Sequence, residues 1–257
     1  MSTGLSGRLS LITGAAGGIG AAVARDLGSA GARLLLVDKS LAALQALGES
    51  VGAQGVDAHL RSLDVTSEGA VGELVEAAEA ELGPIDCLVH CAGVLYPAPA
   101  LEATPRQWDD TFAVNARGPF LLTQQVALRM RVRRRGAIVA VSSNAASVPR
   151  TSMAVYAASK AALTAAMRCV GLELAPHGVR CNIVSPGSTD TTMLSSLGAS
   201  HEQVISGNPS DFKLGVPLGR IAEPLDVARA VRFLLSDEAR HITLHDLRID
   251  GGATLDA

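Results

Sequence analysis

The sequence predicts an α/β chain built on one parallel sheet of seven strands, with helices covering both faces of the sheet. Three observations carry this prediction. Short apolar runs alternate with longer segments of helical periodicity, a rhythm typical of repeated βαβ units. The chain of 257 residues is 48% hydrophobic, which is enough to bury the core of one such domain. A glycine-rich stretch directly follows the first apolar run.

The strands are expected at residues 9–13, 33–38, 58–65, 85–90, 137–142, 180–185 and 246–250. Parallel strands joined by right-handed crossovers give a Rossmann-type, doubly wound sheet in a three-layer α/β/α arrangement. Ligands of such sheets bind in the crevice beyond the carboxyl ends of the strands. We expect a single domain over residues 1–257, with the irregular segment at 188–217 forming a lid that carries short helices of its own.

Capping residues mark several helix boundaries. Helical spacing of apolar residues between positions 71 and 82 follows Ser67, a candidate N-cap, and ends at Gly83. Thr104 precedes a proline and lies three residues before Gln107, the arrangement of a capping box. A long helix is expected from Tyr156 until the proline at position 176 stops it.

The composition argues against several classes of function. A formal net charge of -3 does not favour nucleic acid or an anionic membrane as a partner. No apolar run approaches the roughly 20 residues needed to span a bilayer, and the first residues lack the pattern of a secretory leader, so we expect a cytoplasmic protein. The four cysteines, at positions 87, 91, 169 and 181, show no C-x-x-C spacing, and we interpret them as reduced core residues.

Two further patterns have simpler explanations than a binding site. Five arginines between residues 129 and 135 suggest nucleic acid, but they stand at the end of an expected helix, where cations offset the negative end of the helix dipole. His241 and His245 have the spacing of a helical metal pair, yet they precede a strand and lack a cluster of further ligands nearby in the sequence. We therefore expect neither a nucleic-acid partner nor a metal.

The glycine-rich stretch is a candidate dinucleotide site. Glycines after a buried strand let the N–H groups at a helix start approach a pyrophosphate. Asp38 ends the second strand, where an acid binds the ribose hydroxyls of adenosine and repels a 2′-phosphate, so we expect NAD rather than NADP. The candidate cofactor-binding residues are Gly14, Gly17, Gly18, Ile19, Gly20 and Asp38, then Asp64 and Val65 at the third strand, and Ala92 and Gly93 after the fourth. Asp64 fits equally well as a strand-end cap, and we interpret His90 as a structural histidine.

A second group of residues supplies acid–base chemistry. Tyr156 and Lys160 are four residues apart, so they share one face of a helix, and the ammonium lowers the pKa of the phenol from about 10 toward neutrality. A tyrosinate takes the proton of a carbinol while hydride leaves for a nicotinamide. Ser143, at the carboxyl end of the fifth strand, is a candidate to hold the reacting oxygen. Asn115 is a candidate anchor for a proton-relaying water, or alternatively an amide that bends or caps a helix.

Together these motifs resemble the short-chain dehydrogenase/reductase family over essentially the whole chain. The resemblance is carried by T-G-x-x-x-G-x-G at 13–20, N-A-R-G at 115–118, Ser143, Y-x-x-x-K at 156–160 and Pro-Gly at 186–187. It implies that Ser143 positions the substrate oxygen and that Tyr156 is the acid/base. Lys160 would lower the tyrosine pKa and bind the ribose, and Asn115 would complete the tetrad. The resemblance also implies a homotetramer and cofactor contacts from Tyr156, Lys160, Pro186, Gly187, Thr189 and Thr191.

Longer stretches narrow the resemblance. Residues 178–191 and 212–219, with the segments at 241–244 and 250–255, are similar to the 2,3-dihydro-2,3-dihydroxybenzoate dehydrogenases of catechol siderophore biosynthesis. This similarity implies NAD-dependent oxidation of one ring alcohol of a cyclohexadiene carboxylate, after which the ketone tautomerises to an aromatic catechol. A trans-2,3-dihydro-3-hydroxyanthranilate dehydrogenase, whose substrate has an amino group in place of one hydroxyl, shares these features and is an alternative. The family usually has N-N-A-G where this chain has H-C-A-G at 90–93, a departure that concerns the sheet and adenosine contacts.

A carboxylate substrate calls for a cation near the crevice. Arg150, six residues before Tyr156, is the first candidate, and Lys213 in the expected lid is the second. An exposed, solubilising charge is the alternative role of either cation. Candidates for the wall of an apolar ring pocket are Met153, Met193, Leu194 and Phe212.

Two other functions fit parts of the pattern. A 3-oxoacyl-acyl-carrier-protein reductase shares the general motifs, but Asp38 disfavours NADPH, the cofactor such an enzyme normally uses. A nucleotide-sensing or scaffold protein would keep the fold without turnover. Intact Ser143, Tyr156 and Lys160 argue against that second function.

Overall fold

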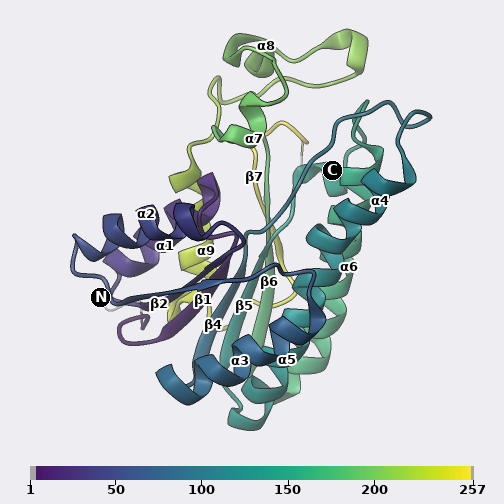
Figure 1. Cartoon of the computed structure of the whole chain (residues 1–257). Coiled ribbons are helices and arrows are strands. Elements are labelled where there is room, and N and C mark those ends of the chain that lie inside the picture. Colours follow the sequence, from purple (N-terminus) through teal and green to yellow (C-terminus); the bar gives the residue numbers. More distant parts are fainter. Residues whose placement is uncertain (1–3, 256–257) are drawn as a thin grey trace.

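Seven strands form one sheet in the order β3-β2-β1-β4-β5-β6-β7 in the computed structural model, which describes residues 4–255. Every pair of neighbouring strands is parallel. The strands are β1 (Leu9–Thr13), β2 (Arg33–Asp38), β3 (Ala58–Ser62), β4 (Ile85–His90), β5 (Gly136–Val141), β6 (Val179–Pro186) and β7 (Asp246–Ile249). The order reverses between β1 and β4, which opens a crevice at their carboxyl ends. The expected doubly wound fold class is thus confirmed (Figure 1).

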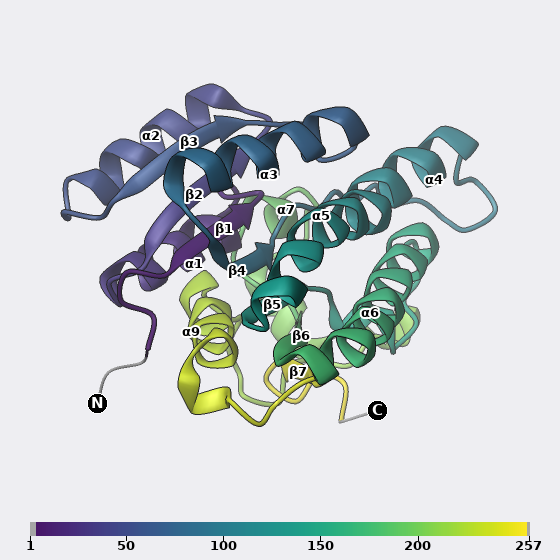
Figure 2. The same ribbon diagram turned by 90° about the horizontal axis from the view of Figure 1, so that it is seen from below.

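Helices cover the sheet on both sides. They are α1 (Gly18–Ser29), α2 (Leu41–Gly52), α3 (Glu68–Leu82), α4 (Pro105–Phe112), α5 (Gly118–Arg133), α6 (Ala154–Leu174), α7 (Thr192–Ser195), α8 (His201–Ser206) and α9 (Pro224–Leu235). Side chains of α1, α2 and α9 form one apolar cluster with the sheet, and those of α3, α5 and α6 form the other. Seen from below, α1 and α9 lie on one side of the strands and α3 and α5 on the other (Figure 2).

The apolar run of β2 shows how the sequence encodes these two layers. Successive side chains of a strand point to opposite faces of the sheet. Leu34 and Leu36 accordingly join one cluster, and Leu35 and Val37 join the other. A strand buried on both faces therefore reads as a continuous apolar stretch rather than as an alternating one.

The capping box expected at the start of α4 is confirmed. The Thr104 hydroxyl oxygen accepts a hydrogen bond from the Gln107 backbone N–H at 3.2 Å, and the Gln107 side-chain oxygen accepts one from the Thr104 N–H at 2.9 Å. Ser67 does occupy the N-cap position of α3, but its side chain makes no capping hydrogen bond. The preceding turn is closed instead by Asp64, whose carboxylate accepts from the Thr66 N–H at 2.9 Å.

Two expectations about the sheet and the core need correction. Strand β3 ends at Ser62, three residues earlier than expected, because the chain turns there toward the crevice. Of the four cysteines, which are all free thiols, Cys169 is exposed on α6 and is not a core residue. Among residues 4–255, each helix is too short or too polar to span a bilayer.

The arginine-rich end of α5 is used for contacts within the chain. Arg133 donates to the Glu79 carboxylate at 2.9 Å and to the Ile85 carbonyl at 3.0 Å. Arg134, in a left-handed conformation at the end of the helix, donates to the Pro176 carbonyl at 2.9 Å. These arginines tie α5 to neighbouring elements.

The segment expected to form a lid follows β6 and lies above the carboxyl edge of the sheet (Figure 1). It contains the short helices α7 and α8 and a 3-10 turn at Pro209–Asp211. Thr189, near the start of this segment, forms a parallel bridge with Ala222, which lies five residues beyond its end. The chain therefore returns to the place where the segment begins.

Candidate active site

The glycine loop between β1 and α1 is closely packed against neighbouring backbone. Gly14 has a φ of +61°, and a Cβ atom there would lie 2.5 Å from the backbone of Ala92. A Cβ on Gly18 would lie 2.7 Å from the Thr191 side chain. The loop therefore touches both the end of β4 and the segment after β6, which brings three expected cofactor segments together.

The start of α1 suits a bound pyrophosphate. Gly17 is the N-cap of this helix and gives it no side-chain cap, and its first turn carries no acidic residue. Such a helix start has N–H groups without side-chain partners and the positive end of a dipole, so it suits a phosphate. The residues present thus fit the pyrophosphate of a dinucleotide.

Asp38 lies beside the glycine loop and is held there by backbone N–H groups. Its carboxylate accepts hydrogen bonds from the Ala16 N–H at 3.2 Å and from the Ser40 N–H at 3.1 Å. One cavity is lined by seven of the expected cofactor residues, Gly14, Gly17, Asp38, Asp64, Val65, Ala92 and Gly93, together with Lys39, Leu63, Cys91, Val94 and Val114. A carboxylate at this position suits the ribose hydroxyls of an adenosine.

A second cavity continues from the first, because Cys91 and Gly93 line both. It contains the expected catalytic residues Ser143, Tyr156 and Lys160 and the expected cofactor residues Ile19, Pro186, Gly187, Thr189 and Thr191. It is also lined by the expected substrate residues Arg150, Met153, Met193, Leu194 and Lys213. Further lining residues are Leu95, Ser188 and Leu197, which were not predicted as site residues from the sequence.

Lys160 is held beside Tyr156 by the backbone of β5. The two residues lie one turn apart on α6, with the lysine nitrogen 5.9 Å from the centre of the tyrosine ring. The ammonium donates a hydrogen bond to the Val141 carbonyl at 2.9 Å. Burial lowers the pKa of Lys160 to about 8, because the charged form is the one that loses solvation.

The pKa of Tyr156 shifts in the direction opposite to the one expected. Burial raises it above its usual value, while a hydrogen bond from Ser143 and the charge of Arg150 act to lower it. The protein's own groups therefore do not bring the phenol toward neutrality, because desolvation of the phenolate outweighs the nearby donors and cation. Among the described residues, Arg150 is a cation whose charge lowers the pKa of this phenol.

Ser143 stands at the point where β5 ends. Its backbone is extended, and its hydroxyl oxygen accepts the Ala145 N–H at 3.1 Å, which caps the 3-10 turn Asn144–Ala146. The cap fixes the rotamer of the serine and leaves its O–H free to donate toward Tyr156 or a reacting oxygen.

Asn115 lies in a π-helical turn, Ala113–Arg117, between α4 and α5. Single π-turns of this kind are frequent at functional sites. Its side-chain oxygen accepts from the Val94 N–H at 2.8 Å, and its amide donates to the Val94 carbonyl at 2.9 Å and to the Ser159 hydroxyl at 3.0 Å. Both amide hydrogens are therefore used to fix the loop after β4 against α6.

His90 has the structural surroundings expected for it. It is buried, and its Nε2 lies 2.8 Å from the Thr123 hydroxyl. Burial, together with the nearby charge of Lys160, lowers the pKa of His90 to about 3. The imidazole is consequently neutral at physiological pH and joins β4 to α5.

A family model described as "Enoyl-(Acyl carrier protein) reductase" matches residues 14–254. The chain belongs to the short-chain dehydrogenase/reductase family. Membership follows from this match over nearly the whole chain, and it confirms the resemblance seen in the motifs. The protein is thus an oxidoreductase of a family that generally uses NAD(H) or NADP(H).

Relatives within the short-chain dehydrogenase/reductase family match nearly the whole length of the chain. The 2,3-dihydro-2,3-dihydroxybenzoate dehydrogenase of Bacillus subtilis is 49% identical over 98% of this chain and 98% of its own length. A vibriobactin-specific enzyme of the same name from Vibrio cholerae is 47% identical over 96% of this chain and 95% of its own. Among solved structures, levodione reductase has a TM-score of 0.91 and 28% identity, covering 98% of this chain and 100% of its own.

One expected substrate residue of this short-chain dehydrogenase lies elsewhere. Phe212 is 91% exposed and does not line the cavity, so the expectation that it walls the ring pocket is wrong. It follows the 3-10 turn at Pro209–Asp211 in a left-handed conformation with a φ of +53°, and its side chain faces solvent. The adjacent Lys213 lines the cavity instead.

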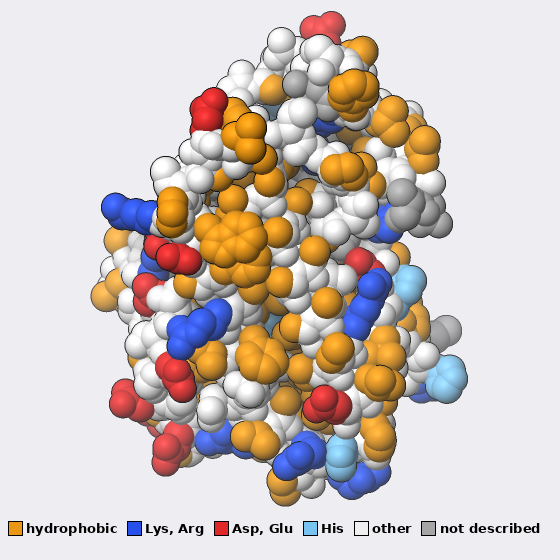
Figure 3. Space-filling model, turned by 90° about the vertical axis from the view of Figure 1, so that its right-hand side faces the viewer, with side chains coloured by type: hydrophobic (Ala, Val, Ile, Leu, Met, Phe, Trp, Pro, Cys, Tyr) orange, Lys and Arg blue, Asp and Glu red, His pale blue; other side chains and the backbone are white. Residues whose placement is uncertain are grey.

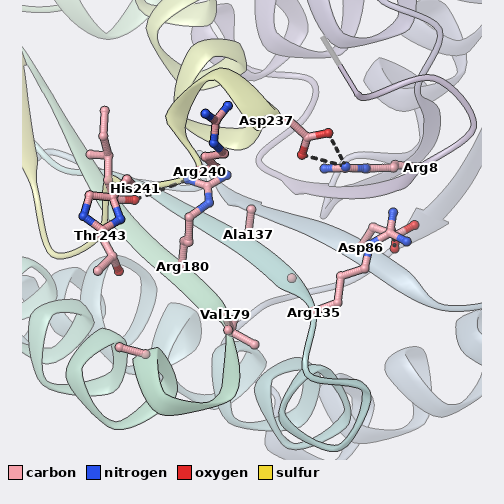
Figure 4. A pocket seen from close by; sticks show the side chains of 14 residues that line it. Arg8, Asp86, Arg135, Ala137, Val179, Arg180, Asp237, Arg240, His241 and Thr243 are labelled. Carbon is pink, nitrogen blue, oxygen red and sulfur yellow. Dashed lines mark hydrogen bonds and ion pairs between the residues drawn. The ribbon is translucent and has the colours of Figure 1, made fainter. Parts of the chain in front are cut away.

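A further pocket of this protein lies at the edge of the sheet where the strands begin, opposite the carboxyl edge that carries the candidate active site (Figure 4). Several of its charged side chains contact one another or the backbone. Arg8 donates to both carboxylate oxygens of Asp237, at 2.8 and 2.9 Å. Arg180 donates to carbonyls at the end of α9, among them Leu235 and Ser236 at 3.1 Å. Arg180 therefore ties the end of α9 to the sheet, whereas the expected catalytic residues lie at the opposite, carboxyl edge.

Proposed function

We propose that the protein oxidises one ring alcohol of 2,3-dihydro-2,3-dihydroxybenzoate with NAD and so forms an aromatic catechol acid. The observation that carries this proposal is the presence of Arg150 beside Tyr156 in one cavity. A substrate with a carboxylate on the same ring as its reacting alcohol places its two functional groups against this cation and this phenol. The names of the relatives from Bacillus subtilis and Vibrio cholerae support the same substrate.

The cofactor in this proposal is NAD, held along the continuous cleft from Asp38 to Lys160. Asp38 would accept the ribose hydroxyls, and the uncapped start of α1 would hold the pyrophosphate. Bound NAD would supply the hydride acceptor. Lys160 would bind the nicotinamide ribose, and Thr189 and Thr191 would lie near the carboxamide and the phosphates.

The chain's own residues then manage the proton and the position of the alcohol. The Ser143 hydroxyl holds the reacting oxygen. Tyr156 takes the proton from that oxygen in its phenolate form, which the Ser143 hydrogen bond and the Arg150 charge favour against burial, as the C–H bond gives up its hydride. The products are a ring ketone, the reduced cofactor and the neutral phenol of Tyr156. The ketone tautomerises to the catechol, so the step runs in one direction. The segment at 188–217 closes over the ring as a lid and excludes water.

The substrate is tested by following NADH formation with three alcohols. These are the dihydroxy acid, the corresponding trans-3-hydroxyanthranilate precursor with an amino group, and a simple secondary alcohol. We expect the dihydroxy acid to give the highest kcat/KM. A higher kcat/KM for the amino-substituted ring acid would identify the enzyme as a hydroxyanthranilate-pathway dehydrogenase, because that acid has the same carboxylate for Arg150 to bind. Turnover of the simple secondary alcohol alone would refute both substrates.

Cofactor choice is tested at Asp38. We expect the wild type to prefer NAD, and Asp38→Asn, which removes the charge but keeps the shape, to lower kcat/KM with NAD by about tenfold, the loss expected for a charge-assisted hydrogen bond. The same variant should gain activity with NADP, because the repulsion of the 2′-phosphate is gone and Lys39 remains adjacent. An unchanged preference for NAD would show that Asp38 does not set cofactor choice.

The assembly in this proposal is a homotetramer in the cytoplasm. Apolar side chains gather on the face that carries α4, α5 and α6 (Figure 3). Phe120 and Leu128 are 37% and 49% exposed there, and they line a groove between α5 and α6 with Ala166 and Val170. A second copy of the same two helices would bury this groove in an isologous contact. The free thiols suit a reducing compartment.

Light scattering coupled to size exclusion tests the assembly. We expect four times the chain mass for the wild type and a smaller species for Leu128→Glu, which puts a charge in the groove. Leu101→Glu is the matched control, because Leu101 is fully exposed in a loop outside the groove. A wild-type monomer would contradict the proposed assembly.

A further inference from the structure

Asn144 connects Arg150 to the end of the sheet. Its side-chain oxygen accepts a hydrogen bond from the Arg150 guanidinium at 2.6 Å, and its amide nitrogen donates to the Asp250 carboxylate at 3.2 Å. Asn144 is fully buried directly after the candidate catalytic serine, and Asp250 follows β7. Residues more than 100 positions apart in sequence thus form one polar chain behind the cavity.

The C-terminal turn holds Asp250 in place. The Gly252 N–H donates to one carboxylate oxygen at 3.0 Å, and the Thr254 hydroxyl donates to the other at 2.8 Å. Burial raises the pKa of Asp250, but hydrogen bonds from Thr254, Asn144 and Gly252 outweigh burial and leave the pKa below its usual value. The group is therefore a carboxylate at neutral pH.

An ionised Asp250 dictates which way the Asn144 amide faces. A carboxylate only accepts hydrogen bonds, so the amide nitrogen must point toward it. The amide oxygen is then turned toward Arg150, whose guanidinium only donates. A reversed amide would set its N–H groups against the guanidinium and its oxygen against the carboxylate, and both contacts would be repulsive.

Arg150 has donors left for a ligand. Among residues 4–255, its side chain has a hydrogen bond to Asn144 and no ion pair with a carboxylate, although it is half-buried and lines the cavity with Tyr156. A partly desolvated guanidinium with unfilled donors is complementary to a carboxylate. One fixed hydrogen bond on the side away from the cavity sets the plane in which the remaining donors lie.

We propose that Asn144 is a positioning residue that, locked by Asp250 and Thr254 of the C-terminal turn, aims Arg150 at the carboxylate of the substrate. The inference rests on the proposed function, because it assigns the ring carboxylate to Arg150. Beyond the proposed function, the inference states that the C-terminal turn, which contacts no reacting atom, controls how strongly the enzyme prefers acids to neutral ring alcohols.

The test compares two substrates in a double-mutant cycle. One substrate is the dihydroxy acid and the other is the same ring diol without the carboxyl group, and selectivity is the ratio of their kcat/KM values. Arg150→Met removes the cation, and Asn144→Ala removes its support. We expect Asn144→Ala to lower selectivity for the acid by about tenfold, through a higher KM for the acid, the loss expected when a hydrogen bond to a charged group is removed. The double variant should be no less selective than Arg150→Met alone, because both changes act on the same contact.

Because Asn144→Ala alters a buried residue and can disturb folding, a second and milder pair of variants tests the same link. Thr254→Val removes the hydroxyl that holds Asp250, and Thr254→Ser restores it. We expect Thr254→Val to lower selectivity in the same direction and Thr254→Ser to recover it, with the KM for NAD unchanged in both. A purely structural role for the turn would change stability or the KM for NAD without changing selectivity.

The outcomes separate this inference from the proposed function. If the wild type does not oxidise the acid, the proposed function and this inference fall together. If the wild type oxidises the acid but Arg150→Met leaves selectivity intact, the proposed function stands and the inference is overturned. If Arg150→Met abolishes selectivity while Asn144→Ala and Thr254→Val keep it, only the positioning role is overturned. Additive losses in the double variant would likewise show that Asn144 acts independently of Arg150.

Discussion

The ammonium of Lys160 lies 5.9 Å from the centre of the Tyr156 ring and is hydrogen-bonded to the backbone of β5. This arrangement fixes the lysine beside the ring, while Ser143 and Arg150 are the groups that lower the pKa of the phenol against the larger effect of burial. The phenol and its neighbouring groups thus have separable roles. Lys160 is placed to bind a ribose, and Arg150 is placed to act on the charge of the phenolate.

The ionisation of Tyr156 tests this division of roles. The chain contains only two tyrosines, so in a Tyr96→Phe background the phenolate absorbance reports Tyr156 alone. We expect it to ionise above the usual value of about 10, because burial disfavours the charged form. Arg150→Met should raise the pKa further, because a stabilising cation is lost, and Lys160→Met should change it less. A larger shift in Lys160→Met would restore the lysine to the role expected from sequence.

Buried His90 makes stability depend on pH. Its pKa in the folded protein is lowered to about 3, whereas the unfolded chain takes up the proton near pH 6.5. Between these values the unfolded state binds more protons, so the free energy of unfolding falls by about 1.4 kcal/mol per pH unit as pH decreases. His90→Asn should reduce that slope by this amount in denaturant titrations between pH 6 and pH 4, a range that lies within the window set by the two pKa values. Equal slopes in the two proteins would mean that His90 is protonated in the fold.

Helix capping offers a matched pair of stability measurements. Thr104→Ala removes a capping box in which both hydrogen bonds are formed, and we expect it to cost about 1 kcal/mol of unfolding free energy. Ser67→Ala alters an N-cap whose side chain makes no capping hydrogen bond, and its cost should be clearly smaller. Comparable losses in chemical denaturation would contradict the difference seen between the two caps.

Much of the fold follows from local patterns in the sequence. Strands such as β2 are buried on both faces, so each reads as an unbroken apolar run, and alternation with helical periodicity selects a parallel sheet. In a parallel sheet the ends of strands meet at one edge, which is why Asp38, Gly93 and Ser143 were expected near one another from their positions alone. The cleft that they line is the region where the topology leaves room for a ligand.

Other features depend on tertiary contacts that no local pattern records. The hydrogen bond from Asn144 to Asp250 joins the ends of β5 and β7, and the spacing of these residues in the sequence does not predict it. The pKa of Tyr156 depends on how deeply the ring is buried, which the four-residue spacing to Lys160 does not reveal. Phe212 looked like a pocket residue because it is apolar and lies in the segment after β6, but its backbone conformation turns it outward.

The most direct measurement of the central claim is the rate of NADH formation from the dihydroxy acid by wild type and by Tyr156→Phe, with NAD binding measured separately by calorimetry. Phenylalanine keeps the ring beside Lys160 and removes only the group that accepts the proton. The account predicts a loss of about 1,000-fold in kcat, within the range contributed by a positioned acid–base group, with NAD affinity retained. A variant that oxidises the acid at the wild-type rate, with NAD bound as before, would contradict the assignment of Tyr156 as the base.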